Sequence, residues 1–163
     1  GLAAVKEDAA MHETEALHIR RLTAEDLEPL HRLLSDPAVM RYLEPPFTRA
    51  QTEAFLQKAG MGREPLIRAV EDGRGFAGYV IYHPYDETSM ELGWVLASDR
   101  WGRGYALALT RQMICRARES GRDAVIECHP QQAATRHIAE KLGFRPCGMD
   151  GGCCVYRLAG KNE

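Results

Sequence analysis

The sequence lacks the features of a membrane-spanning or secreted chain. Among its 163 residues, no apolar run approaches the roughly 20 residues that a helix needs to cross a bilayer. The first 15 residues are rich in alanine and acidic residues but have no apolar core, so they do not resemble a signal peptide. We therefore expect residues 1–15 to be a flexible leader and residues 16–160 to form a single domain. We expect the protein to be cytoplasmic, with no membrane partner.

An excess of charge of either sign is also lacking. The sequence has 21 Lys and Arg against 23 Asp and Glu, a formal net charge of −2. Nucleic-acid-binding domains usually carry a basic excess, so we expect no nucleic-acid partner, and any anion site must be local. Hydrophobic residues make up 45% and charged residues 27%, which is typical of a globular domain with a buried core.

The five cysteines lack the spacing of a metal site or a disulfide framework. Their number is odd, and no two of them have the two-residue separation typical of zinc ligands. Cys153 and Cys154 are adjacent, so on a strand they would point to opposite faces, which is a poor geometry for chelation. We expect reduced thiols and no metal cofactor.

Hydrophobic periodicity and capping signals predict an alternation of strands and helices. Seven strands are predicted, at Leu17–Thr23, Leu66–Glu71, Phe76–His83, Ser89–Leu96, Asp123–His129, Phe144–Cys147 and Cys153–Leu158. Four helices are predicted, at about 24–34, 49–59, 105–120 and 132–142. Thr23 with Asp26, and Thr48 with Gln51, have the spacing of a capping box at the first two helices. The glycine-rich segment Gly148–Gly152 is expected to be a flexible loop. This order predicts a mostly antiparallel α/β sheet with one strand–helix–strand crossover near its middle.

The most informative segment is the turn Ser98–Ala106, which links the fourth strand to the third helix. Gly102 and Gly104 flank Arg103 in this turn. Glycine lets the backbone come close to a ligand, and the first amide groups of a helix attract anions. Arg100 and Arg103 add positive charge. The segment therefore predicts a phosphate-bearing ligand that is held mainly by backbone amides.

Two other phosphate motifs fit this turn less well. A dinucleotide fingerprint needs a third glycine where the sequence has Leu107, although Glu127 has the right distance for a ribose-binding acid. The antiparallel strands predicted before the crossover also argue against a doubly wound sheet. A nucleotide P-loop is excluded, because no lysine with serine or threonine follows the turn.

Four segments form one pattern through their order and spacing. They are Leu17–Leu22 (LHIRRL), Glu91–Leu96 (ELGWVL), Trp101–Ala106 (WGRGYA) and Ala139–Phe144 (AEKLGF). The pattern resembles the GNAT superfamily of acetyl-CoA-dependent N-acetyltransferases, and most closely its ribosomal-protein N-terminal acetyltransferase branch. The resemblance implies an α+β fold with a mostly antiparallel mixed sheet of about seven strands. It also implies that the central strands 4 and 5 splay apart and that about four helices flank the sheet.

The resemblance implies acetyl-CoA as the co-substrate. Backbone groups of Val95 and Leu96, at the splay, would pair with pantetheine as an added strand. Gly93 fits either a bulge that starts the splay or a close backbone contact. The amides that would hold the pyrophosphate are those of Gly102, Arg103, Gly104, Tyr105 and Ala106. The side chains of Arg103 and Arg100 would face the other CoA phosphate.

Direct attack of a neutral amine on a thioester needs a proton acceptor and a donor for the leaving thiolate, but no covalent enzyme intermediate. The branch usually has a glutamate on the fourth strand, which makes Glu91 the candidate base, acting through water. Thr135 stands where the branch has serine and would donate a hydrogen bond to the thiolate. Gln132 stands where the branch has asparagine and would hold the pantetheine amide.

Other interpretations of these residues stay open. His83 and His129 lie at predicted strand ends and are alternative bases. Cys128 is near the expected sulfur, which suggests an acyl-cysteine, although nothing near it in the sequence activates a thiolate. Because Gln132 and Thr135 replace the residues usual in the branch, a CoA-binding regulatory module with weak or no turnover is the rival function.

The acceptor can be argued only from the chemistry of amines. At pH 7 an α-amine with a pKa of about 8 is roughly one-tenth neutral, whereas a lysine with a pKa of about 10.4 is neutral in only a few molecules per ten thousand. A single weakly placed base therefore favours a protein or peptide N-terminus, with small amines such as polyamines close behind. We expect the first two helices and Gly148–Gly152 to recognise the acceptor, in a monomer or a homodimer.

Overall fold

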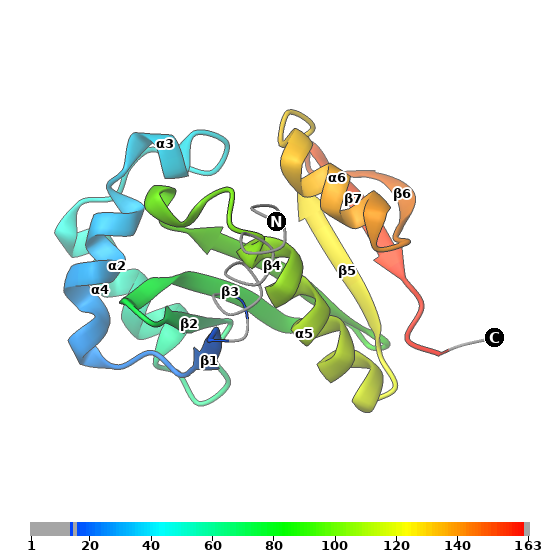
Figure 1. Ribbon diagram of the computed structural model, residues 1–163, viewed down its shortest axis with the longest axis horizontal. Helices are drawn as coiled ribbons and strands as arrows, with labels where there is room; N and C mark the ends of the chain where they lie inside the picture. Colours follow the sequence, from blue (N-terminus) through cyan, green and yellow to red (C-terminus); the bar gives the residue numbers. More distant parts are fainter. Residues whose placement is uncertain (1–13, 15, 162–163) are drawn as a thin grey trace, which may run out of the picture. The chain divides into compact units, whose positions relative to one another are not determined.

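The computed structural model describes Thr14 and residues 16–161 (Figure 1). The predicted leader, residues 1–15, lies outside the described residues except for Thr14. The described residues divide into two compact units. The first contains the chain up to Val80 together with Trp94–Leu109, and the second contains Ile81–Gly93 and the chain from Thr110 onward. The prediction that residues 16–160 form a single domain is therefore neither confirmed nor contradicted.

The first unit contains the N-terminal strands and most of the short helices. Its strands are β1 (His18–Arg20), β2 (Ile67–Asp72), the first part of β3 (Gly75–Asp86) and the last part of β4 (Ser89–Leu96). Its helical segments are η1 (Ala24–Asp26), α2 (Leu27–Leu34), α3 (Pro37–Met40), α4 (Arg49–Phe55), the π-helical η2 (Leu56–Gly60), η3 (Ser98–Arg100) and the start of α5 (Tyr105–Glu119). Its core is made by large apolar side chains of α2, η2 and β2, among them Leu30, Leu34, Leu56 and Val70.

The second unit contains the remainder of β3, β4 and α5 and the C-terminal elements. These are β5 (Asp123–Cys128), α6 (Ala133–Lys141), β6 (Arg145–Asp150) and β7 (Cys153–Leu158). β7 pairs antiparallel with both β5 and β6. The strand order in the sheet is β1-β2-β3-β4-β5-β7-β6, where neighbouring strands are hydrogen-bonded to each other. This seven-stranded mixed sheet with its flanking helices confirms the predicted fold.

The predicted crossover is confirmed by the pairing of β4 with β5. These two strands are parallel, with Ser89, Met90 and Glu91 opposite Asp123, Ala124 and Val125. The parallel pairing ends at Glu91, although β4 itself continues to Leu96. The pairing with β5 therefore covers only the first residues of β4, and the splay that the resemblance implies stays an expectation.

Local capping explains where the first helices begin. The amide of Gln51 donates to the Thr48 hydroxyl at 3.1 Å, and the Thr48 amide donates to the Gln51 side-chain oxygen at 2.8 Å. This reciprocal pair is the predicted capping box of α4. At the first helix, the Thr23 amide donates to the Asp26 carboxylate at 2.8 Å, and a 3₁₀ turn precedes α2.

The predicted flexible loop at Gly148–Gly152 is wrong. Strand β6 continues to Asp150, where Met149 and Asp150 pair with Cys154 and Cys153. Gly151 and Gly152, with φ of +55° and +83°, form a two-residue connection between the strands. Tight hairpin turns need such φ values, so the connection is a two-residue turn and not a loop of five residues.

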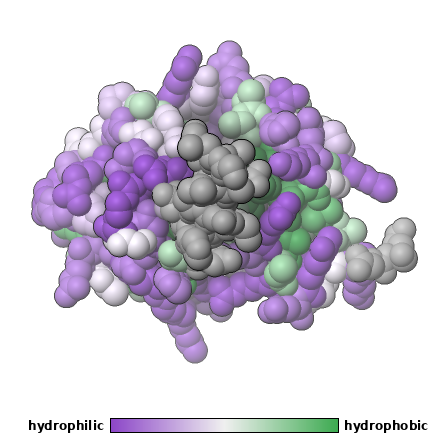
Figure 2. Space-filling view, viewed as in Figure 1, coloured by the Kyte–Doolittle hydropathy of each residue, from purple (hydrophilic) through white to green (hydrophobic). Residues whose placement is uncertain are grey.

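The surface is mostly hydrophilic on the face in Figure 2. Large apolar side chains are exposed at Leu43, Met61, Leu66, Trp101 and Met149 in the described part of the chain. None of the described helices has the length and apolar character needed to cross a membrane.

Candidate active site

The turn between β4 and α5 has the backbone conformation that its glycines predict. Gly102 and Gly104 have φ of +74° and +80°, a region in which a residue with a Cβ atom is strained. A Cβ atom at Gly102 would meet no described atom within 4 Å, and one at Gly104 would meet only the Thr14 side chain at 3.9 Å. Glycine is therefore required here by the backbone conformation and not by crowding.

Helix α5 begins directly after this turn. The amide of Ala108 donates to the Gly104 carbonyl at 3.1 Å, so Gly104 directly precedes the first helical residue, Tyr105, and Gly102 and Arg103 lie in the turn before the helix. This end of a helix carries a partial positive charge of roughly half an elementary charge and favours anions. The geometry is compatible with the predicted phosphate site, which stays a prediction.

One carboxylate that sequence reasoning missed holds both ends of this turn. Asp72, the last residue of β2, accepts hydrogen bonds from Arg100 Nε at 2.8 Å and from the Tyr105 hydroxyl at 2.9 Å. The Asp72 and Arg100 side chains are only 3% and 9% exposed. The Arg100 guanidinium holds the pKa of Asp72 well below its usual range. In the sequence Asp72 looks like an ordinary turn residue before Gly73, and no local signal links it to the phosphate turn.

The two arginines of the turn have different surroundings. Arg100 also contacts both carboxylate oxygens of Asp99 at 3.0 Å, so two acidic residues neutralise its charge. Arg103 is half-buried, and its Nε donates to the Asp99 carbonyl at 3.3 Å. Arg100 is thus a structural anchor of the turn. The phosphate contacts predicted for Arg100 and Arg103 both stay predictions.

The residues predicted to pair with pantetheine are buried at the end of β4. Val95 and Leu96 are each 6% exposed. A Cβ atom at Gly78 would lie 2.1 Å from the Val95 carbonyl oxygen, so β3 approaches β4 closely at this point. The Leu96 carbonyl accepts a hydrogen bond from the Trp101 indole at 3.0 Å. Because a carbonyl oxygen has two lone pairs, it can accept a second donor.

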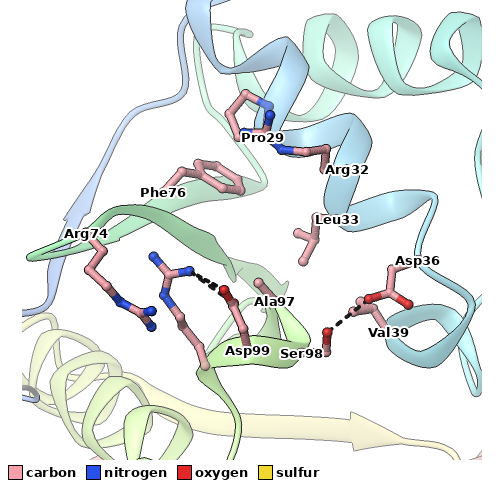
Figure 3. Close-up of a pocket in the computed structure, with 11 residues that line it drawn as sticks. Pro29, Arg32, Leu33, Asp36, Val39, Arg74, Phe76, Ala97, Ser98 and Asp99 are labelled. Carbon is pink, nitrogen blue, oxygen red and sulfur yellow. Dashed lines mark hydrogen bonds and ion pairs between the residues drawn. The ribbon is translucent and has the colours of Figure 1, made fainter.

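A pocket of about 530 Å³ lies against the same turn in the first unit (Figure 3). Its apolar wall consists of Pro29, Leu33, Val39 and Phe76. Its polar side includes Ser98, Asp99 and Arg100. The Ser98 hydroxyl donates to the Asp36 carboxylate at 3.1 Å, and this carboxylate also caps α3 through the Ala38 amide. The turn is therefore attached to α3 as well as to β2.

The candidate base and one of its two alternatives form a pair in the second unit. Nε2 of His83, on β3, lies 3.2 Å from Oε2 of Glu91, on β4. Nδ1 of His83 lies 2.9 Å from the carbonyl oxygen of Pro84. The Glu91 carboxylate raises the pKa of His83. Sequence reasoning treated these two residues as rivals, whereas the structure brings them into contact.

Gly93 makes a close contact within the same unit. A Cβ atom at this position would lie 3.0 Å from the Ile81 side chain, and Gly93 has no positive φ. The close contact is thus with a side chain and not with the predicted backbone, and the bulge stays a prediction.

Gln132 and Thr135 lie at the start of α6. Gln132 precedes the helix as its N-cap residue, and its side-chain oxygen accepts a hydrogen bond from the His129 amide at 2.8 Å. The His129 ring belongs to the same turn, because its Nδ1 accepts from the Gln131 amide at 3.1 Å. Thr135 is half-buried in the first turn of α6. Roles of Gln132 and Thr135 in binding and catalysis stay predictions.

Cys128 has an environment that disfavours a thiolate. Burial raises the pKa of its thiol to about 11. It lies opposite Cys154 in the pairing of β5 with β7. A thiol with such a pKa is almost fully protonated at pH 7, which argues against an acyl-cysteine. Within the described residues, no group of three or more His, Cys, Asp or Glu is placed to hold a metal ion.

Sequence comparison identifies related proteins over most of the chain. Residues 16–145 match the family model of the acetyltransferase (GNAT) domain. An uncharacterized N-acetyltransferase of Bacillus subtilis (strain 168), YnaD, is 26% identical over 145 residues, which cover 86% of this chain and 85% of that protein.

Solved structures share the fold. An acetyltransferase (GNAT family) from Bacillus anthracis has a TM-score of 0.75 and 25% identity, over 89% of this chain and 95% of that one. The spermidine N-acetyltransferase from Vibrio cholerae, solved in complex with CoA and spermine, has a TM-score of 0.71 and 22% identity. That similarity covers 88% of this chain and 94% of the other.

Proposed function

Because the chain belongs to the GNAT acetyltransferase family, we propose that it transfers an acetyl group from acetyl-CoA to the α-amine of a protein or peptide N-terminus. Within the family we place it in the ribosomal-protein N-terminal branch, on the four segments that resemble it. The observation that carries the proposal is the turn at the start of α5, where two positive-φ glycines lie at the anion-favouring end of a helix.

The turn fits the phosphates of CoA in both charge and rigidity. Its backbone is fixed by the Asp72–Arg100 pair on one side and by the Tyr105 hydroxyl on the other, so little ordering is needed when a ligand binds. The amides of Gly102–Ala106 would hold the pyrophosphate, and Arg103 with Arg100 would face the other phosphate. When bound, acetyl-CoA supplies an acetyl group on a thioester.

Five residues of the chain would carry the remaining binding and chemistry. Val95 and Leu96 would pair through their backbone with pantetheine, and Gln132 would hold its amide. Glu91 would take the proton of the attacking amine through water, as the nitrogen–carbon bond forms and the carbon–sulfur bond breaks. The Thr135 hydroxyl would donate a hydrogen bond to the sulfur that leaves.

The acceptor class rests on amine chemistry and on the branch resemblance. An N-terminal amine is far more often neutral at pH 7 than a lysine, so it needs less help from a base. The Vibrio cholerae relative is a spermidine N-acetyltransferase, and a polyamine is therefore the second acceptor class to test.

Release of free thiol measured with a panel of amines tests this function. The panel contains a peptide with a free N-terminus and no lysine, the same peptide with a blocked N-terminus and one lysine, a polyamine, and a free amino acid. We expect thiol release with the first peptide and little with the blocked one. Release with the polyamine alone would replace the N-terminus by a small amine as the acceptor.

The rival function predicts a different result in the same assay. A CoA-binding regulatory module would be stabilised against heat by CoA but would release no amine-dependent thiol at any acceptor concentration. Stabilisation by CoA without turnover would therefore contradict acetyl transfer and favour the regulatory module.

A further inference from the structure

The hydrogen-bond partners of His83 determine where its protons lie. Nδ1 is 2.9 Å from the Pro84 carbonyl oxygen, which can only accept, so Nδ1 carries a proton. A neutral ring has a single N–H, so its Nε2 would present a lone pair to Oε2 of Glu91 at 3.2 Å. Two acceptors at this distance repel each other. The contact is therefore favourable when a proton lies between Nε2 and Oε2.

The shared proton makes His83 and Glu91 one titrating unit. Groups in such close contact lose their protons at apparent pKa values that belong to the pair and not to either residue. Glu91 raises the pKa of His83, while partial burial opposes this effect. While Nε2 of His83 is protonated, the Glu91 carboxylate faces an imidazolium. Once the proton has left, the pair is a stronger base than a lone carboxylate.

Tyr85 is a second titratable group of β3 near the pair. Tyr85, two residues further along β3, donates its hydroxyl to the Glu127 carboxylate on β5 at 2.8 Å. That carboxylate raises the pKa of Tyr85 to about 12, and the charges of Asp150 and Glu91 act in the same direction. The residue opposite Glu91 on β5 is the apolar Val125. Tyr85 therefore keeps its proton near neutral pH, while the His83–Glu91 pair changes its charge.

We propose that His83 is a positioning residue that contacts Glu91 through Nε2, and that the His83–Glu91 pair, once Nε2 has lost its proton, accepts the proton of the attacking amine. This inference rests on the proposed acetyl transfer. The amine nitrogen bonds to the acetyl carbon, and the carbon–sulfur bond breaks with its electron pair on sulfur. The amine proton passes through water to Glu91 and is then shared with Nε2 of His83, from which solvent removes it.

The dependence of kcat on pH tests the pair, measured with both substrates saturating so that it reports the groups of the bound enzyme. In the wild type we expect kcat to rise with pH about a midpoint above the roughly 6.5 of an ordinary histidine. In His83→Gln we expect the midpoint of the kcat profile to move to lower pH, toward the range in which carboxylates titrate. We also expect the maximal kcat to fall about tenfold or more. His137→Gln, an exposed histidine of α6, should superimpose on the wild type. An unchanged rise in His83→Gln would overturn the proposal.

Nuclear magnetic resonance of the full chain with labelled histidine gives a second readout that needs no turnover. We expect the His83 ring to titrate above about 6.5 in the wild type, and at least about one pH unit lower in Glu91→Gln. An equal midpoint in both proteins would overturn the coupling of the pair. Absence of thiol release by the wild type with every amine, while the coupling is present, would instead contradict acetyl transfer.

Discussion

Oδ2 of Asp72, at the end of β2, lies 2.8 Å from Nε of Arg100, in the segment that leads from β4 into α5. The same oxygen accepts the hydroxyl of Tyr105, the first residue of α5. One buried carboxylate therefore holds the chain on both sides of Gly102 and Gly104. The glycines leave the turn conformationally permissive, and Asp72 restricts it to one geometry.

Asp72→Ala should destabilise the protein strongly. Removing Asp72 takes from Arg100 its buried partner and leaves only the exposed Asp99, and it also removes the acceptor of the Tyr105 hydroxyl, so the loss should approach the roughly 3–5 kcal/mol typical of breaking a buried ion pair. The pKa of Asp72 is lowered in the folded state. The variant should therefore lose the full free energy of unfolding that Asp72 contributes at pH values above the pKa of about 4 that an aspartate has in the unfolded chain. Below that pH the loss should become smaller. Urea unfolding at pH 7 and pH 3 measures the free energy of unfolding of the wild type and of the variant. The difference between the two proteins should be smaller at pH 3.

The exposed pair of Glu28 with Arg49 provides the matched control for that variant. Both side chains are more than half exposed, so their interaction is screened by water. Glu28→Ala should leave the free energy of unfolding and the affinity for CoA close to those of the wild type. An equal loss of stability in Glu28→Ala and Asp72→Ala would contradict a special role for Asp72.

Gly102→Ala should weaken CoA binding more than it weakens folding. Its φ of +74° costs an alanine about 1–2 kcal/mol, and no described side chain crowds the position. The added methyl group would stand where the phosphates approach the backbone. Titration calorimetry with CoA measures the binding, and Gly73→Ala is the control, because Gly73 is equally uncrowded and lacks a positive φ. Normal affinity in Gly102→Ala would argue against phosphate binding at this turn.

Cys128→Ala should keep most of the acetyl transfer activity. Burial raises the pKa of this thiol to about 11, so it offers almost no thiolate at neutral pH. Direct attack by the amine also predicts initial-velocity lines that intersect when both substrates are varied. Parallel lines together with loss of turnover in Cys128→Ala would establish an acyl-cysteine instead.

His83→Gln should reduce stability more at pH 6 than at pH 9. The pKa of His83 is raised in the folded state by Glu91, so the pair contributes fully below the unfolded value of about 6.5 and loses its contribution as pH rises through the folded value. Thermal unfolding of wild type and variant at the two pH values measures the difference. If the two proteins differ in stability by the same amount at pH 6 and at pH 9, protonation of the pair does not contribute to stability.

The elements of the fold could largely be predicted because their signals are local. Alternating apolar residues predicted β4 over Ser89–Leu96 with the bounds that the structure has, and Thr48 with Gln51 predicted the start of α4. The hairpin at Gly148–Gly152 was predicted wrongly as a flexible loop. Gly151 and Gly152 supply the positive φ values of a tight turn. A glycine-rich sequence alone does not tell such a turn from a longer flexible loop.

Contacts between distant segments could not be predicted in the same way. Asp72 and Arg100 are 28 residues apart, and His83 and Glu91 face each other because of the register of neighbouring strands. The sequence period sets which face of a strand a residue occupies but not which residue lies opposite it. Glu91 and His83 were therefore predicted as separate candidates, and Asp72 was not predicted at all.

A crystal structure of the protein with acetyl-CoA tests the central claim most directly. The account predicts the pyrophosphate within hydrogen-bonding distance of the amides from Gly102 to Ala106, with pantetheine running along Val95 and Leu96. Acetyl-CoA bound elsewhere on the chain, with no phosphate at the start of α5, would contradict it.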